Sequence, residues 1–88
     1  MISIFSKFFH SKEKEENAQL ERENKQLVSD LAYVCSRLRE IRAAYDLVCE
    51  DELVEAMIYE EKSLMSKYSY LLRIAKERKL TNIPAVSQ

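Results

Sequence analysis

The 88-residue sequence contains no glycine and a single proline, Pro84. Glycine and proline are the residues that most often form tight turns and hairpin connections, so their near absence favours long, uninterrupted helices. The lack of glycine also excludes a phosphate-binding loop and a dinucleotide-binding fingerprint. The sequence therefore predicts an all-α protein.

Residues that commonly carry chemistry are scarce. The sequence has one histidine, His10, and two cysteines, Cys35 and Cys49. A catalytic nucleophile needs a base within hydrogen-bond reach, and a structural zinc site needs four cysteine or histidine ligands. We therefore expect no catalytic residue, no metal site, no cofactor and no enzymatic activity.

The two cysteines are expected to remain free. If the residues between them are helical, Cys35 and Cys49 lie about 20 Å apart, which is far beyond disulfide reach. Two half-buried thiols in a reducing cytoplasm are the simpler interpretation. The prediction is a cytoplasmic protein.

Composition limits the class of protein further. Hydrophobic residues make up 47% and charged residues 33% of the chain, which is too apolar for a disordered chain and too charged for a membrane protein. A net charge of −1 gives no overall attraction to nucleic acid or to an acidic membrane. A chain of this length forms one small domain at most, and its limited core favours association with a partner.

The periodicity of apolar residues predicts a first helix over residues 11–48. Positions on its inward face step alternately by three and four residues, which is the spacing of a coiled-coil seam. These positions are Asn17, Leu20, Asn24, Leu27, Leu31, Val34, Leu38, Ile41, Tyr45 and Val48. Asn17 and Asn24 either fix the register as buried residues or are solvated near the start of the helix, and we favour solvation.

A second helix is predicted over residues 51–79. Glu50, Asp51 and Glu52 place negative charge beside its positive end. Its apolar residues, from Leu53 to Ala75, span an arc of about 140° at 100° per residue, wider than a coiled-coil seam requires. The connection between the helices is short, so we expect an antiparallel, coiled-coil-like hairpin, with a four-helix bundle if two copies associate.

Charge supports this orientation. In a hairpin that folds near Cys49, residues whose numbers sum to about 99 face each other. Arg37, Arg39 and Arg42 then lie near Glu55, Glu60 and Glu61, and the basic end of the second helix lies near Glu15, Glu16, Glu21 and Glu23. The same rule predicts core layers of Leu31 with Tyr68, Leu27 with Leu72 and Ile41 with Ile58.

The second helix offers two candidate binding surfaces. Its wide apolar stripe leaves Ile58, Met65 and Leu72 available for another protein, and Tyr59 and Tyr70 point outward, as does Tyr33 of the first helix. Its basic end, formed by Lys67, Arg73, Lys76, Arg78 and Lys79, is the candidate site for nucleic acid. Because those charges spread around the helix and face an acidic partner helix, self-pairing explains them better.

The two ends of the sequence fall outside the predicted hairpin. Residues 1–10 include Phe5, Phe8 and Phe9 and form a flexible tail, a segment folded back on the bundle, or a short amphipathic helix at a membrane surface. We do not expect a secretory signal, because no small-residue cleavage site follows them. Residues 81–88 are predicted to be a C-terminal tail.

The second predicted helix contains Ile58, Tyr59, Glu60 and Tyr68 and ends with Leu71-Leu72-Arg73-Ile74-Ala75-Lys76. Through these residues, the segment 40–80 resembles the YaaL-like family of short proteins from Gram-positive bacteria, which form a domain of unknown function. Asp51 stands where the family has proline. The resemblance implies a small cytoplasmic helical protein and lends no catalytic residue.

These observations favour an interaction or adaptor protein that binds a second copy of itself or another protein through the second helix. Nucleic-acid binding is the alternative, and membrane association through residues 1–10 is a weaker one.

Overall fold

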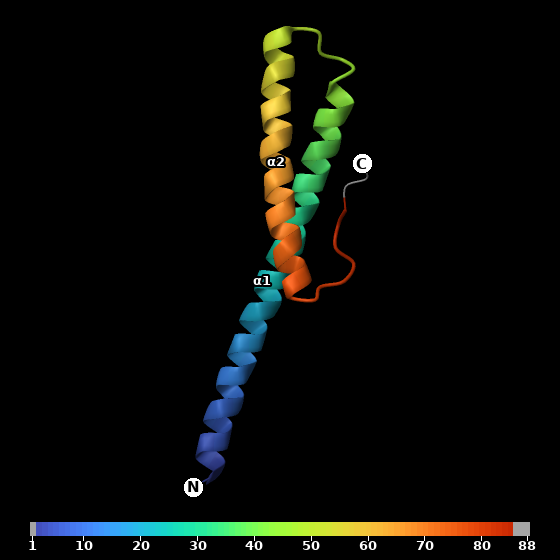
Figure 1. Ribbon diagram of the computed structural model, residues 1–88. Helices are drawn as coiled ribbons and strands as arrows, with labels where there is room; N and C mark the ends of the chain where they lie inside the picture. The colour runs from blue at the N-terminus through green and yellow to red at the C-terminus, as the bar shows by residue number, and fades with distance from the viewer. Residues whose placement is uncertain (1, 86–88) are drawn as a thin grey trace.

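The computed structural model describes the backbone of residues 2–85 and the side chains of residues 14–85. Two helices, α1 (Ile2–Ala44) and α2 (Asp51–Glu77), run antiparallel and pack against each other (Figure 1). The predicted all-α hairpin is therefore confirmed. Residues 45–50 connect the helices, and the chain after α2 turns back alongside α1 (Figure 1).

The two helices differ in length, and this sets the shape of the molecule. The 43 residues of α1 extend beyond the 27 residues of α2, so that the N-terminal half of α1 projects alone (Figure 1). The molecule measures 74 × 21 × 16 Å. We call residues 2–22 the arm, because Glu23 and Asn24 are the first described side chains of α1 that form an ion pair or a hydrogen bond with Arg78, at the end of α2.

The helix boundaries correct the sequence-based ones at three points. α1 begins at Ile2 rather than near Ser11 and ends at Ala44 rather than Val48, where the amide of Leu47 donates to the carbonyl of Ala44 in a turn. α2 begins at Asp51, as expected, but ends at Glu77 rather than Lys79. The predicted membrane contact through Phe5, Phe8 and Phe9 concerns side chains outside the described residues.

The core is a single seam of α1 packed on α2. Five of the predicted seam residues are buried: Leu27, Leu31, Val34, Leu38 and Ile41. Leu64 of α2 closes the cluster nearer the connection, and Ala75 closes the cluster at the open end. Tyr45 and Tyr68 pack against these clusters as half-buried side chains, as their seam positions predicted.

Two of the predicted core layers are wrong. Ile58 is 41% exposed, and Ile41 packs in the cluster of Leu64 instead. Leu27 shares its cluster with Ala75, whereas Leu72 is half-buried and is not among the described side chains that pack in this cluster. The wide apolar arc of α2 explains these errors, because several rotations of the helix bury a similar apolar area.

The seam also stops short of its predicted start. Leu20 is 47% exposed and Asn17 is exposed, because α2 ends before it reaches them. Asn24 is half-buried and accepts a hydrogen bond from Arg78 Nη1 at 3.0 Å. The prediction that both asparagines are solvated therefore holds for Asn17 alone.

The end of α2 turns the chain without glycine. Lys79 adopts a left-handed conformation with φ 57°, and the amides of Lys79 and Leu80 donate to the carbonyls of Lys76 and Ala75, each at 3.0 Å. This pair of bonds is a Schellman motif, which usually has glycine at the left-handed position. Leu80 packs on Ala75 within the open-end cluster, and Ile83 joins the same cluster. The tail thus helps to cover the core.

Candidate interaction surface

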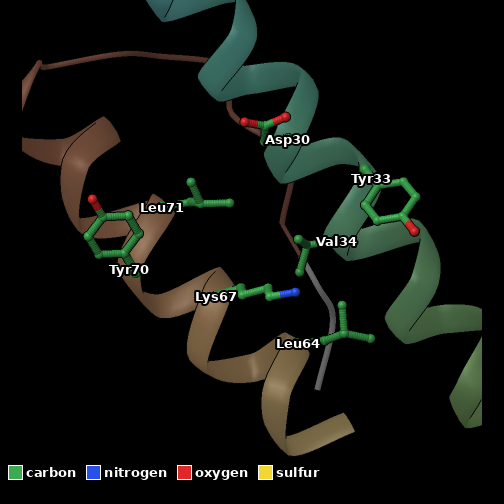
Figure 2. A pocket seen from close by; sticks show the side chains of 7 residues that line it. All are labelled: Asp30, Tyr33, Val34, Leu64, Lys67, Tyr70 and Leu71. Atoms are coloured by element: carbon green, nitrogen blue, oxygen red, sulfur yellow. The ribbon is translucent and has the colours of Figure 1, made fainter. Parts of the chain in front are cut away.

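A groove of about 270 Å³ runs along one flank of the hairpin between the two helices. Val34, Leu64 and Leu71 line its apolar floor, while Tyr33 of α1 and Tyr70 of α2 stand at its sides (Figure 2). Both tyrosines are largely exposed, at 68% and 55%. Exposed aromatic rings beside an apolar floor are typical of surfaces that bind other proteins.

The polar residues at the groove differ in their bonding. The carboxylate of Asp30 accepts a hydrogen bond from Gln26 Nε2 at 2.8 Å. Lys67 extends from α2 toward α1 (Figure 2) and forms no hydrogen bond or ion pair with any described side chain. The groove therefore combines an apolar floor with one unpaired positive charge.

The groove continues toward the open end of the hairpin. A second hollow shares Asp30, Tyr70 and Leu71 with the first and extends to Leu27, Ile74 and Arg78. The guanidinium carbon of Arg73 lies 5.6 Å from the centre of the Tyr70 ring, which is within the range of a cation–π contact. We call the two hollows together the flank groove.

The five residues predicted to bind a partner do not form one surface. Tyr59 and Tyr70 are three turns apart on the flank-groove side of α2, and Tyr59 is exposed. Ile58, Met65 and Leu72 follow one another at seven-residue spacing on the opposite flank. Met65 is half-buried against the core, with its sulfur 3.8 Å from Arg42 Nη2, so this flank is partly used by the fold itself.

The predicted nucleic-acid residues are also dispersed. Arg78 binds Glu23 at 3.8 Å and Asn24, and Arg73 lies over Tyr70. Lys67 lies at the flank groove, whereas Lys76 is on the opposite side of α2, beside Leu72. Lys79 is exposed in the turn that follows α2. These five residues form no continuous basic face among the described residues.

Ion pairs join the helices near the connection, close to the predicted register. Arg37 Nη2 lies 2.8 Å from Glu60 Oε1, and Arg42 Nε lies 3.9 Å from Glu61 Oε2. All four side chains remain partly exposed, so each pair contributes little to stability and mainly favours the antiparallel orientation.

Both cysteines are free, as expected, but their surroundings differ. Cys35 is buried and Cys49 is exposed rather than half-buried. Burial raises the pKa of the Cys35 thiol above its ordinary value, and the positive charge of Arg39 opposes this increase. A thiol with a raised pKa is a poor nucleophile, so Cys35 is a packing residue.

The outward position of Tyr33 was predicted from the sequence, but its place beside a groove between the two helices was not. The signal was present, because Tyr33 and Lys67 have numbers that sum to about 100 and therefore face each other across the hairpin. A surface built by two helices becomes visible only when residues of both are considered together.

Among the side chains of residues 14–85, no three histidine, cysteine, aspartate or glutamate residues cluster as a metal site would require. Neither helix, over its described residues, has a stretch that is long and apolar enough to span a bilayer.

Residues 8–82 match the model of a protein family described as a protein of unknown function, DUF2508. The chain belongs to this family. The match covers both helices from the arm to the turn after α2. No curated protein and no solved structure matches the chain at a significant level. The likeness to a family of unknown function, expected from residues 40–80, thus extends over most of the chain.

Proposed function

We propose that this DUF2508 protein is a protein–protein interaction module and that its binding surface is the flank groove. The observation that supports this proposal is the placement of two exposed tyrosines, Tyr33 and Tyr70, on different helices around a shared apolar floor. Tyrosine contributes a large contact area at a low entropic cost and is enriched in protein interfaces.

The shape of the groove indicates what kind of segment it binds. It runs along the helix axes from Leu64 to Arg78, so a third helix can lie lengthwise between α1 and α2. An amphipathic helix recognised in this way inserts apolar residues at three- and four-residue spacing. The unpaired Lys67 favours an acidic residue on the same helix.

This proposal moves the contact surface predicted from sequence. Tyr70 lines the flank groove, and Tyr59 is on the same side of α2 but outside the lining of the groove. Ile58, Met65 and Leu72 lie on the other flank of α2 and are secondary candidates. In this proposal the protein acts in the cytoplasm, where the exposed Cys49 stays a free thiol.

Photo-crosslinking tests the proposal directly. A benzophenone amino acid placed at Tyr33, on the rim of the groove, is expected to crosslink to a protein in the cells that produce the chain. The same group at Leu47, which is 82% exposed in the connection, is the control. Tyr70→Ala should reduce crosslinking from position 33 about tenfold. Equal crosslinking from both positions, or no loss in Tyr70→Ala, would refute the groove as the binding surface.

A further inference from the structure

We infer that the flank groove binds the arm of a second copy of this chain, so that two molecules form an antiparallel dimer with a three-helix bundle at each end. The inference rests on the proposed function and names its partner. Three observations carry it: the length of the arm, its pattern of charge, and the exposure of Leu20.

The arm has the length that such a dimer requires. α1 spans residues 2–44, so its midpoint is Glu23, which pairs with Arg78 at the end of α2. A two-fold axis near residue 23 places the 21-residue arm of one copy beside residues 24–44 of the other. Each arm, which is unpartnered in the single chain (Figure 1), is then covered over its full length by the hairpin of the other copy.

Charge selects this orientation. In the antiparallel dimer the arm of one copy runs parallel to α2 of the other. Residues 2–12 contain Lys7 and Lys12 and no acidic residue, and the two-fold axis sets them beside residues 55–65 of α2, which contain three acidic residues and one basic residue.

The second half of each element has the reverse charge. Residues 13–23 are predominantly acidic, and they lie beside residues 66–76, which contain three basic residues and no acidic one. Opposite signs therefore meet along the whole arm. A parallel dimer would place arm beside arm and leave both flank grooves empty.

Individual residues in the arm fit the groove. Leu20 is 47% exposed, and the two-fold axis brings it level with Gln26 of the other copy, where the groove is lined by Leu27 and Ile74. Glu16 is exposed and forms no ion pair with a described side chain. It lies within one helical turn of the other copy's unpaired Lys67, so the contact pairs both charges.

Spin-label distances measured on the full-length chain test the geometry. Single labels are placed at the exposed positions Arg22→Cys and Ser36→Cys in a Cys49→Ser background, in which the buried Cys35 stays unlabelled. The distance between copies should increase by about 3 Å for each residue from the two-fold axis, which is twice the helical rise. We expect less than about 25 Å at position 22 and about 40 Å at position 36. Similar distances at both positions would indicate a parallel dimer and overturn the inference.

Sedimentation equilibrium of matched variants tests the contacts. Leu20→Glu should weaken the dimer at least about tenfold, whereas Leu47→Glu, at an exposed leucine of the connection, should not. Lys67→Glu should weaken it as well, while Lys62→Glu, on an exposed position away from the groove, should leave it unchanged. Circular dichroism should show the same helix content in all four variants. Dimerisation that is insensitive to Leu20→Glu would overturn the inference.

The dimer and the role of the flank groove as a binding surface can fail separately. A chain that sediments as a monomer at about 100 μM refutes the dimer. If position 33 still crosslinks to a different protein in cells, the groove remains a binding surface and only its partner was wrong. If position 33 crosslinks to nothing, the proposed function fails too.

Discussion

Arg37 of α1 links two glutamates that come from different helices. Its Nε and Nη2 atoms lie 3.0 and 2.8 Å from Glu60 Oε1 on α2, and its Nη1 atom lies 2.9 Å from Glu40 Oε2 one turn further along α1. A hydrogen bond to Glu40 and, next in size, a hydrogen bond to Glu60 raise the pKa of Arg37 above its ordinary value, so these bonds favour the charged guanidinium. This ion pair lies level with the core cluster nearer the connection, which contains Val34, Leu38, Ile41 and Leu64.

The first prediction concerns this pair. Glu60→Gln should lower the urea midpoint of unfolding slightly in low salt, because the charge-assisted bond to Arg37 is partly solvated. In about 1 M NaCl, where exposed charges are screened, wild type and variant should unfold at the same midpoint. A difference that persists at high salt would mean that Glu60 contributes through packing instead.

Truncation of a buried seam residue of α1 should lower the free energy of unfolding much more than Glu60→Gln does. Leu38 is fully buried between Val34, Ile41 and Leu64, and Leu38→Ala should cost about 2–4 kcal/mol of unfolding free energy. A domain of this size is stabilised by only a few kcal/mol, so the variant should lose most of its cooperative thermal transition by circular dichroism. Leu47→Ala, at the exposed leucine of the connection, is the control and should change the midpoint little.

The antiparallel hairpin could be predicted because its signals are local. The three- and four-residue spacing from Leu27 to Ile41 identifies the buried face of α1, and the charges of Arg37 and Glu60 favour one orientation. The rotation of α2 could not be predicted, because an apolar arc of about 140° fits several rotations equally well. Ile58 was therefore placed in the core although it lies outside it.

The candidate site was predicted only in part, for a related reason. Tyr70 and Lys67 were recognised on α2, but the groove exists only where they face Tyr33 and Val34 of α1. The exposure of Leu20 depends on where α2 ends, and that end is a turn with no glycine or proline to mark it. Such a turn leaves no local signal in the sequence.

That turn provides the next prediction. Lys79 has φ 57°, a conformation that costs a residue with a Cβ atom about 1 kcal/mol and glycine almost nothing. Lys79→Gly should therefore stabilise the hairpin by about 0.5–1 kcal/mol in urea denaturation. Lys79→Ala removes the same charge and side chain but keeps the Cβ atom, so it should not stabilise. Equal gains in both variants would assign the effect to charge rather than to the backbone.

The alkaline limit of stability should depend on Tyr45. Burial, together with the charge of Glu61 and a hydrogen bond to it, raises the pKa of Tyr45, and the charge of Arg42 lowers it in part. The folded state therefore holds this proton more tightly than the unfolded state. Its contribution to stability is complete below the pKa of an unfolded tyrosine, about 10, and is lost as the pH rises through the higher folded value.

The measurement compares the wild type with Tyr45→Phe. Absorbance near 295 nm follows tyrosine ionisation, and the highest-pH component of the titration should disappear in the variant, while the loss of stability above about pH 10 should become shallower. A titration curve that loses an early component instead would show that Tyr45 is solvated.

The two thiols should report on opening of the hairpin. Cys49 is exposed, whereas Cys35 is buried and has a raised pKa. A thiol reagent such as a disulfide dye should therefore modify Cys49 rapidly in the native protein and Cys35 only when the hairpin opens. In the Cys49→Ser variant only the slow reaction of Cys35 remains. Adding Leu38→Ala to this variant should accelerate the reaction, because the weakened core opens more often. Adding Lys79→Gly instead should make the reaction slower than in Cys49→Ser alone. A rate that is identical in all three proteins would mean that reagent reaches Cys35 without separation of the helices.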